Sequence, residues 1–254
     1  AVVHGHVLTV KQFIEFGNSK QFNSPDLGGR TPMHCVLYAM LRIKPGPANA
    51  AHQADMNKVA DIKAMSLVER AKRAAVVASE HADDVDQKAR FPKEAVEAMK
   101  AEKLMGIQIP VELGGEGAST AEIAEVCSIL GQACSAAAMT FSMHQIKASS
   151  LVSHGDGASW HRDFMARIAS EQLLLGSATT EAGIGGNLRN SICAVEVEGD
   201  RCRLEKDATV ISYGEEADAI LVTSRSHKDA APSDQVMTVF LKGQYSLEKT
   251  HDWD

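Results

Sequence analysis

The segment SATTEAGIGGNLRNS, residues 177–191, brings two threonines, three glycines and an arginine together directly after an apolar run. Thr180 offers both a backbone N–H and a hydroxyl as hydrogen-bond donors. Gly185 and Gly186 can adopt positive φ and let the backbone approach a ligand closely. Two interpretations are open: a plain turn, or a loop that holds a ligand through backbone N–H groups.

The elements expected around this segment are helices before it and strands after it. Residues 56–172 carry apolar side chains near the helical period, and Ser119 with Thr120 can cap the helix that follows them. From Leu173 the period changes to two, and residues 192–212 predict two strands around a turn at 198–200. A helical block followed by strands predicts an α+β fold rather than alternating βαβ units.

The same order of elements argues against a Rossmann dinucleotide site. The stretch GIGGN is not GxGxxG, and it precedes strands instead of joining a strand to a helix.

The composition argues against several other classes of protein. A net charge of -7 over 254 residues gives no basic face, so a nucleic-acid partner is not expected. The sequence contains no run of about 18 apolar residues that would predict a transmembrane helix, so no membrane partner is expected either. The cysteines lack zinc-ligand spacing, which favours reduced core thiols in a cytoplasm-like compartment and predicts no metal site.

Residues 1–55 read as an irregular N-terminal extension. Within them, Asp26–Leu41 resembles the opening of an ankyrin repeat, where a Thr-Pro-Leu-His start leads a turn into a helix. No second unit lies one repeat away, and single solenoid units cannot bury their faces alone. A chance turn with a short helix is one interpretation, and a non-enzymatic binding module built on residues 26–41 is the other.

Three segments in order resemble acyl-CoA dehydrogenases: FPKEAVEAMKAEKLMGIQIPVELGGEGAS at 91–119, SATTEAGIGGN at 177–187 and ATVISYGEEADAILVTSR at 208–225. The resemblance implies an N-terminal α-helical domain at 56–172. It also implies an incomplete antiparallel β-domain, the family's middle domain, at 173–254. The family's C-terminal helical domain is expected to be absent, so the chain is expected to be a truncated member.

The resemblance implies an FAD-dependent oxidoreductase that removes two hydrogens from the α and β carbons of an acyl-CoA thioester. Such chemistry needs a carboxylate base for the α-proton and hydrogen bonds to the developing enolate. It also needs a flavin N5 that accepts the β-hydride. A flavin-dependent monooxygenase on the same fold is the alternative enzyme.

The family's cofactor contacts can be carried over residue by residue. Thr179 and Thr180 match positions that meet the flavin's pyrimidine edge. Gly185 and Gly186 match the turn near the FAD pyrophosphate, and Ser212 matches a Thr beside the flavin N5.

This chain also departs from the family pattern at four positions. Ala182 replaces a Pro, Gly186 a Ser, Asn187 an Asp and Val210 a Trp. Backbone donors survive these side-chain changes, so a flavin loop is still expected.

His144 is expected either to bind substrate beside the flavin or to pack inside a helical core. Glu181 belongs to the cofactor loop and is not assigned as a base. No catalytic residue is assigned, because the family carries its catalytic Glu in the C-terminal helical domain. The chain alone is therefore expected to be catalytically silent and to retain FAD weakly.

The partners implied by the resemblance are an acyl-CoA substrate and an electron acceptor such as an electron-transfer flavoprotein. A homo-oligomer is expected for the full-length form. The expected location is cytoplasmic, or mitochondrial or peroxisomal in a eukaryote.

Overall fold

The computed structural model describes residues 62, 64–154, 159–198 and 201–249. The extension 1–55, with the ankyrin-like stretch, lies outside these residues. The described residues up to Leu175 form one compact unit, and those from Gly176 onward form another.

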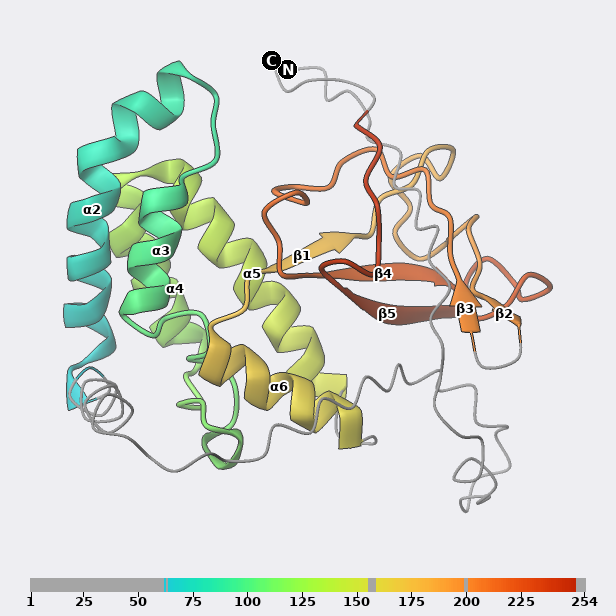
Figure 1. The fold of residues 1–254 in the computed structure, drawn as a ribbon, viewed down its shortest axis with the longest axis horizontal. Helices are drawn as coiled ribbons and strands as arrows, with labels where there is room; N and C mark the ends of the chain where they lie inside the picture. The colour runs from blue at the N-terminus through green and yellow to red at the C-terminus, as the bar shows by residue number, and fades with distance from the viewer. Residues whose placement is uncertain (1–61, 63, 155–158, 199–200, 250–254) are drawn as a thin grey trace. The chain divides into compact units, whose positions relative to one another are not determined.

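The first unit is helical and the second contains short strands (Figure 1). The helices are α2 (Leu67–Gln87), α3 (Lys93–Ala101), η2 (Val111–Leu113), α4 (Thr120–Ala133), α5 (Ser135–His154) and α6 (Ser159–Glu171). The strands are β1 (Leu175–Ala178), β2 (Glu196–Glu198), β3 (Arg201–Arg203), β4 (Ala219–Arg225) and β5 (Gln235–Leu241). This order confirms the predicted α+β class.

Local sequence fixes where two of the helices begin. Ser119 accepts a hydrogen bond from the backbone N–H of Glu122, and the Glu122 carboxylate accepts from the Ser119 backbone in return. Ser66 and Glu69 form the same reciprocal box before α2. Each box satisfies two N–H groups that a helix start leaves without intrahelical partners. The predicted cap at Ser119 is therefore confirmed.

Small side chains let the helices approach closely. Ala78 on α2, Ala95 on α3 and Ala137 on α5 form one buried cluster with Cys134. Larger apolar side chains, including Phe141 on α5, fill the interior elsewhere. This packing buries the apolar faces that the helical period predicted.

A buried arginine ties α2 to the glycine-rich segment that follows α3. The Arg70 side chain is fully buried, and its Nη1 donates to Glu116 Oε1 at 3.0 Å and to the Glu102 carbonyl at 3.2 Å. Gly115 permits a close approach in the same segment, because a Cβ there would lie 1.9 Å from the Ile109 carbonyl oxygen. The segment between α3 and α4 is thus a tightly held turn.

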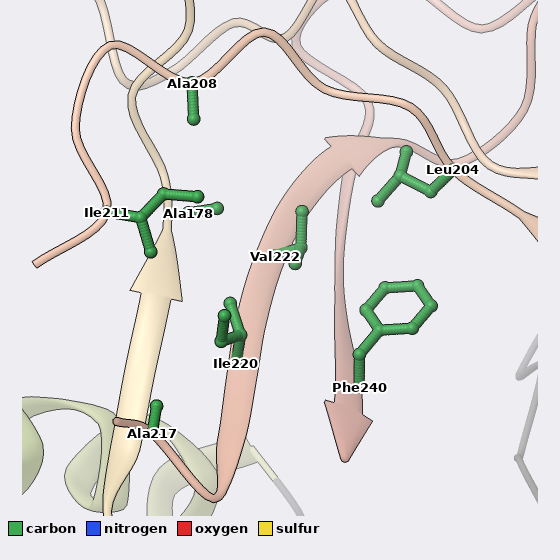
Figure 2. Packing of buried hydrophobic residues seen from close by; sticks show 8 residues of the cluster. All are labelled: Ala178, Leu204, Ala208, Ile211, Ala217, Ile220, Val222 and Phe240. Atoms are coloured by element: carbon green, nitrogen blue, oxygen red, sulfur yellow. The ribbon is translucent and has the colours of Figure 1, made fainter. Parts of the chain in front are cut away.

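The second unit holds a three-stranded sheet, in the order β1–β4–β5, and a separate β2–β3 hairpin. Strands β4 and β5 pair antiparallel with Leu221 opposite Val239, and β2 and β3 pair antiparallel with Val197 opposite Cys202. Strand β1 instead runs in the same direction as β4 (Figure 2). The expected antiparallel pairing therefore holds for two of the three strand pairs.

Residues 204–212 leave the hairpin and cover one face of the sheet. Figure 2 shows Leu204, Ala208 and Ile211 directed toward Ile220 and Val222 of β4. Phe240 of β5 completes this core. The predicted strand reaching Ser212 is wrong, because the chain after Arg203 packs over the sheet instead of pairing with it.

Among the described helices, none combines the length and apolar character needed to cross a membrane.

Candidate functional site

The glycine-rich loop begins where β1 ends, at Thr179. Because parallel neighbours such as β1 and β4 cannot be joined by a tight turn, a long crossover must connect them. The loop lies in that crossover, as does the hairpin. Its position is therefore a consequence of the sheet topology.

Gly185 and Gly186 lie exposed in this loop with φ of 59° and 81°. A Cβ at either position would meet no atom within 4 Å. Their backbone N–H groups donate to no acceptor within the described parts of the chain. The two glycines thus present free backbone donors in open space, which fits the ligand-holding interpretation.

Two hydrogen bonds place the start of the loop beside residues 207–212. The Thr180 hydroxyl donates to the Val210 carbonyl at 3.3 Å, and the Ala182 N–H donates to the Asp207 carbonyl at 2.9 Å. Ser212 follows two residues after Val210 in a turn and is partly exposed. Thr180 therefore lies beside the segment that carries Ser212, but its hydroxyl proton is directed at Val210 rather than outward.

The Thr179 backbone also joins the loop to the sheet. Its carbonyl accepts a hydrogen bond of 3.4 Å from the hydroxyl of Thr223 on β4. The two threonines of the loop are thus held by opposite neighbours, β4 on one side and residues 207–212 on the other.

The carboxylate of Glu181 joins the two ends of residues 182–191. Oε1 accepts from the Cys193 N–H at 2.6 Å, and Oε2 accepts from the Ile192 N–H at 2.9 Å. The Glu181 side chain is only 4% exposed. One buried side chain therefore links the two residues that flank 182–191, Glu181 and Ile192, and also reaches Cys193.

Lys206 is the counter-ion of that carboxylate. Its Nζ lies 3.2 Å from Glu181 Oε2 and donates to the Thr223 carbonyl at 2.9 Å, and its side chain is fully buried. The Cys193 Sγ lies 3.6 Å from the same nitrogen. The buried pair thus connects the loop to strand β4.

Sequence reasoning missed Lys206, although a signal was present. Cys202, Leu204, Lys206 and Ala208 are all buried, at alternate positions in an extended segment. A lysine at an inward position of a two-residue period needs a buried partner, because burying an unpaired charge is costly.

The pKa values of Glu181 and Cys193 follow from burial and charge. Burial raises the pKa of Glu181, but the N–H groups of Ile192 and Cys193 together with the Lys206 charge outweigh it, so the net pKa is lowered. For Cys193, burial raises the pKa of the thiol to about 12. At neutral pH the Glu181 carboxylate is therefore ionised and the Cys193 thiol is protonated.

His144 lies in the helical unit, on α5. It is fully buried, its Nδ1 accepts from the Leu175 N–H at 3.0 Å, and its Nε2 lies 2.7 Å from the Met105 carbonyl oxygen. Both ring nitrogens are therefore engaged by backbone groups. These contacts favour the packed histidine over the substrate-binding one.

In the described residues, no group of three or more His, Cys, Asp or Glu side chains could hold a metal ion.

Residues 66–172 match the model of the acyl-CoA dehydrogenase N-terminal domain. Through this segment the chain is similar to the acyl-CoA dehydrogenase family. The match spans α2 to α6 and includes the capping box of α2, the Arg70 tie and the buried His144.

A probable acyl-CoA dehydrogenase of Mycobacterium leprae is 27% identical over 120 residues, which are 47% of this chain and 31% of that relative. The chain thus spans about a third of the length of this acyl-CoA dehydrogenase.

Solved structures extend the likeness into the β unit. Butyryl-CoA dehydrogenase from Megasphaera elsdenii matches with a TM-score of 0.61 at 16% identity, covering 70% of this chain and 48% of that one. Methanesulfinate monooxygenase from Pseudomonas fluorescens matches with a TM-score of 0.60 at 16% identity, covering 70% and 44%. At these identities the likeness shows the acyl-CoA dehydrogenase fold alone.

Proposed function

We propose that the chain is part of an FAD-dependent oxidoreductase that carries out α,β-dehydrogenation of an acyl-CoA thioester. The match of residues 66–172 to the acyl-CoA dehydrogenase N-terminal domain carries this proposal. FAD, when bound, would supply the hydride acceptor at its N5.

The glycine loop fits a flavin nucleotide on the geometry of its donors. Gly185 and Gly186 present exposed N–H groups that could hold the pyrophosphate, as backbone donors at positive φ do in other anion sites. Thr179, Thr180 and Ser212 would lie along the flavin ring. The contribution of Thr180 is expected from its backbone N–H, since its hydroxyl donates to Val210.

The proton-abstracting base is not assigned to any described residue. Glu181 is unsuitable, because its carboxylate is buried and engaged by two N–H groups and an ammonium. We propose that this chain alone binds FAD weakly and does not turn over acyl-CoA. An electron-transfer flavoprotein as acceptor, a homo-oligomer of the full-length form and a cytoplasmic location belong to the same proposal.

Titration of FAD into the purified chain tests the cofactor assignment. Saturable quenching of flavin fluorescence, lost when Gly185 and Gly186 are both replaced by Val, is the expected result. A matched control is the replacement of Gly243, which also has positive φ and open surroundings but lies after β5. Equal FAD affinity in the loop variant and in wild type would reject the loop as the cofactor site.

A flavin-dependent monooxygenase is the second candidate, supported by the structural match to methanesulfinate monooxygenase. The two candidate activities can be distinguished by experiments on the full-length protein loaded with FAD. Anaerobic bleaching of the flavin by an acyl-CoA supports dehydrogenation. Substrate-dependent oxygen consumption by the reduced flavin, without bleaching by acyl-CoA, supports the monooxygenase.

A further inference from the structure

We propose that Lys206 is a positioning residue for the cofactor loop: through Glu181 it holds residues 182–191 in the shape that binds the nucleotide. The proposal rests on FAD being the ligand of this loop. Lys206 lies outside residues 182–191 and contacts Glu181 before them and Cys193 after them.

One carboxylate joins the two ends of residues 182–191. Glu181 precedes residues 182–191, and Ile192 and Cys193 follow them. The N–H groups of Ile192 and Cys193 donate to the Glu181 oxygens at 2.9 and 2.6 Å. The N–H groups of Ala182 and Ser191 also donate, at 2.9 Å, to the Asp207 and Pro232 carbonyls. Those bonds run to other segments, whereas the Glu181 carboxylate links the two ends directly.

The Glu181 carboxylate in turn depends on Lys206. A buried ion is tolerated only when it is paired and hydrogen-bonded. The Lys206 ammonium is itself fixed by the Thr223 carbonyl at 2.9 Å, so it holds the carboxylate against β4. Without the Lys206 ammonium, the negative charge of Glu181 would favour a conformation in which this carboxylate leaves its buried position and is exposed to water.

Two backbone contacts link Glu181 to the turn that carries Gly185 and Gly186. Ile184 N–H contacts the Glu181 carbonyl at 3.4 Å, and Asn187 N–H donates to the Ile184 carbonyl at 3.0 Å. These turns start from Glu181 and carry Gly185 and Gly186. A shift of Glu181 therefore moves the two N–H groups proposed to hold the pyrophosphate.

The test compares Lys206→Met, Lys206→Arg and the control Lys242→Met. Lys242 is exposed and its Nζ donates to the Glu215 carbonyl, away from the loop. A fourth variant, Glu181→Gln with Lys206→Met, removes both buried charges and serves if Lys206→Met does not fold. Urea unfolding of each variant establishes conditions in which all are folded.

Hydrogen exchange of the Ile192 and Cys193 amides is the readout that needs no cofactor. We expect at least a tenfold faster exchange in Lys206→Met, or in the double variant, with the Val239 amide of β5 unchanged. Lys206→Arg should restore protection, and Lys242→Met should not alter it. Unchanged protection of both amides would overturn the proposal.

FAD titration of the same folded proteins is the second readout. We expect a dissociation constant at least tenfold higher in Lys206→Met, recovery in Lys206→Arg, and no change in Lys242→Met. A constant within twofold of wild type in Lys206→Met overturns the positioning role. Failure of the wild-type chain to bind FAD would overturn the proposed function, while altered amide exchange would still support the closure of the loop by Lys206.

Discussion

The Nδ1 of His144 accepts a hydrogen bond of 3.0 Å from the backbone N–H of Leu175, the last residue of the helical unit. Because this nitrogen accepts, the ring proton lies on Nε2, which donates to the Met105 carbonyl at 2.7 Å. The ring thus joins α5 to Leu175, at the start of β1, and to Met105, in the segment after α3.

Replacing His144 by Leu is expected to lower the free energy of unfolding by about 2–4 kcal/mol, since it removes the hydrogen bonds that the buried ring makes to the Leu175 N–H and the Met105 carbonyl. Urea denaturation at pH 7 measures the loss. His154→Leu, at the exposed end of the same helix, is the control and should change stability by less than about 0.5 kcal/mol. Equal stability of both variants would contradict a structural role for His144.

Glu181 should contribute a pH-dependent part of the stability. Its folded-state pKa is lowered, so the contribution is fully present above the unfolded pKa of about 4.3 and is lost as pH falls through the folded value. The difference in unfolding free energy between wild type and Glu181→Gln should therefore be constant from about pH 7 to 5 and shrink below about pH 4. Glu205→Gln, in an exposed pair with Arg203, supplies the control. A difference that grew on acidification would show that the sign is wrong.

Cys193 is expected to resist alkylation in the folded chain. Burial raises the pKa of its thiol to about 12, so little thiolate exists at pH 8. Peptide-resolved mass spectrometry after iodoacetamide treatment should find Cys193 unmodified at a time when the urea-unfolded chain is fully alkylated. Rapid labelling of native Cys193 would argue against this environment.

Arg70 and Arg73 should differ strongly although they lie one turn apart on α2. Arg70→Met removes a fully buried guanidinium and leaves Glu116 without its partner, which is expected to cost about 3 kcal/mol. The Arg73 side chain is 57% exposed, and Arg73→Met should cost less than about 1 kcal/mol. Thermal or urea unfolding of both variants checks the contrast, and similar losses would refute it.

Local signals in the sequence predicted local structure well. Ser119 predicted a helix start because a cap and its partner, Glu122, are three residues apart. The hairpin around 198–200 was predicted from alternation and turn residues, and the structure pairs Glu198 with Arg201.

The contacts of Lys206 with Glu181 and Thr223 could not be predicted in the same way. Lys206 meets Glu181 across 25 residues and Thr223 across 17, and no local rule fixes such distances. Its sequence surroundings, LEKD, read as a solvated charged stretch. The two interpretations of His144 also required the fold, because its partners are backbone groups of distant segments. The cofactor contacts of Thr179, Thr180, Gly185, Gly186 and Ser212 stay predictions.

The closure of residues 182–191 by a single buried carboxylate has a consequence for how the protein can change over generations. Since the ends are held at Glu181 and Cys193, substitutions at the exposed positions 182, 183 and 185–189 can alter the loop while these bonds remain. The departures from the family pattern at Ala182, Gly186 and Asn187 all lie inside this span. The fold thereby separates exposed positions that can vary with the ligand from the residues that hold the loop, Glu181 and Lys206, which depend on each other.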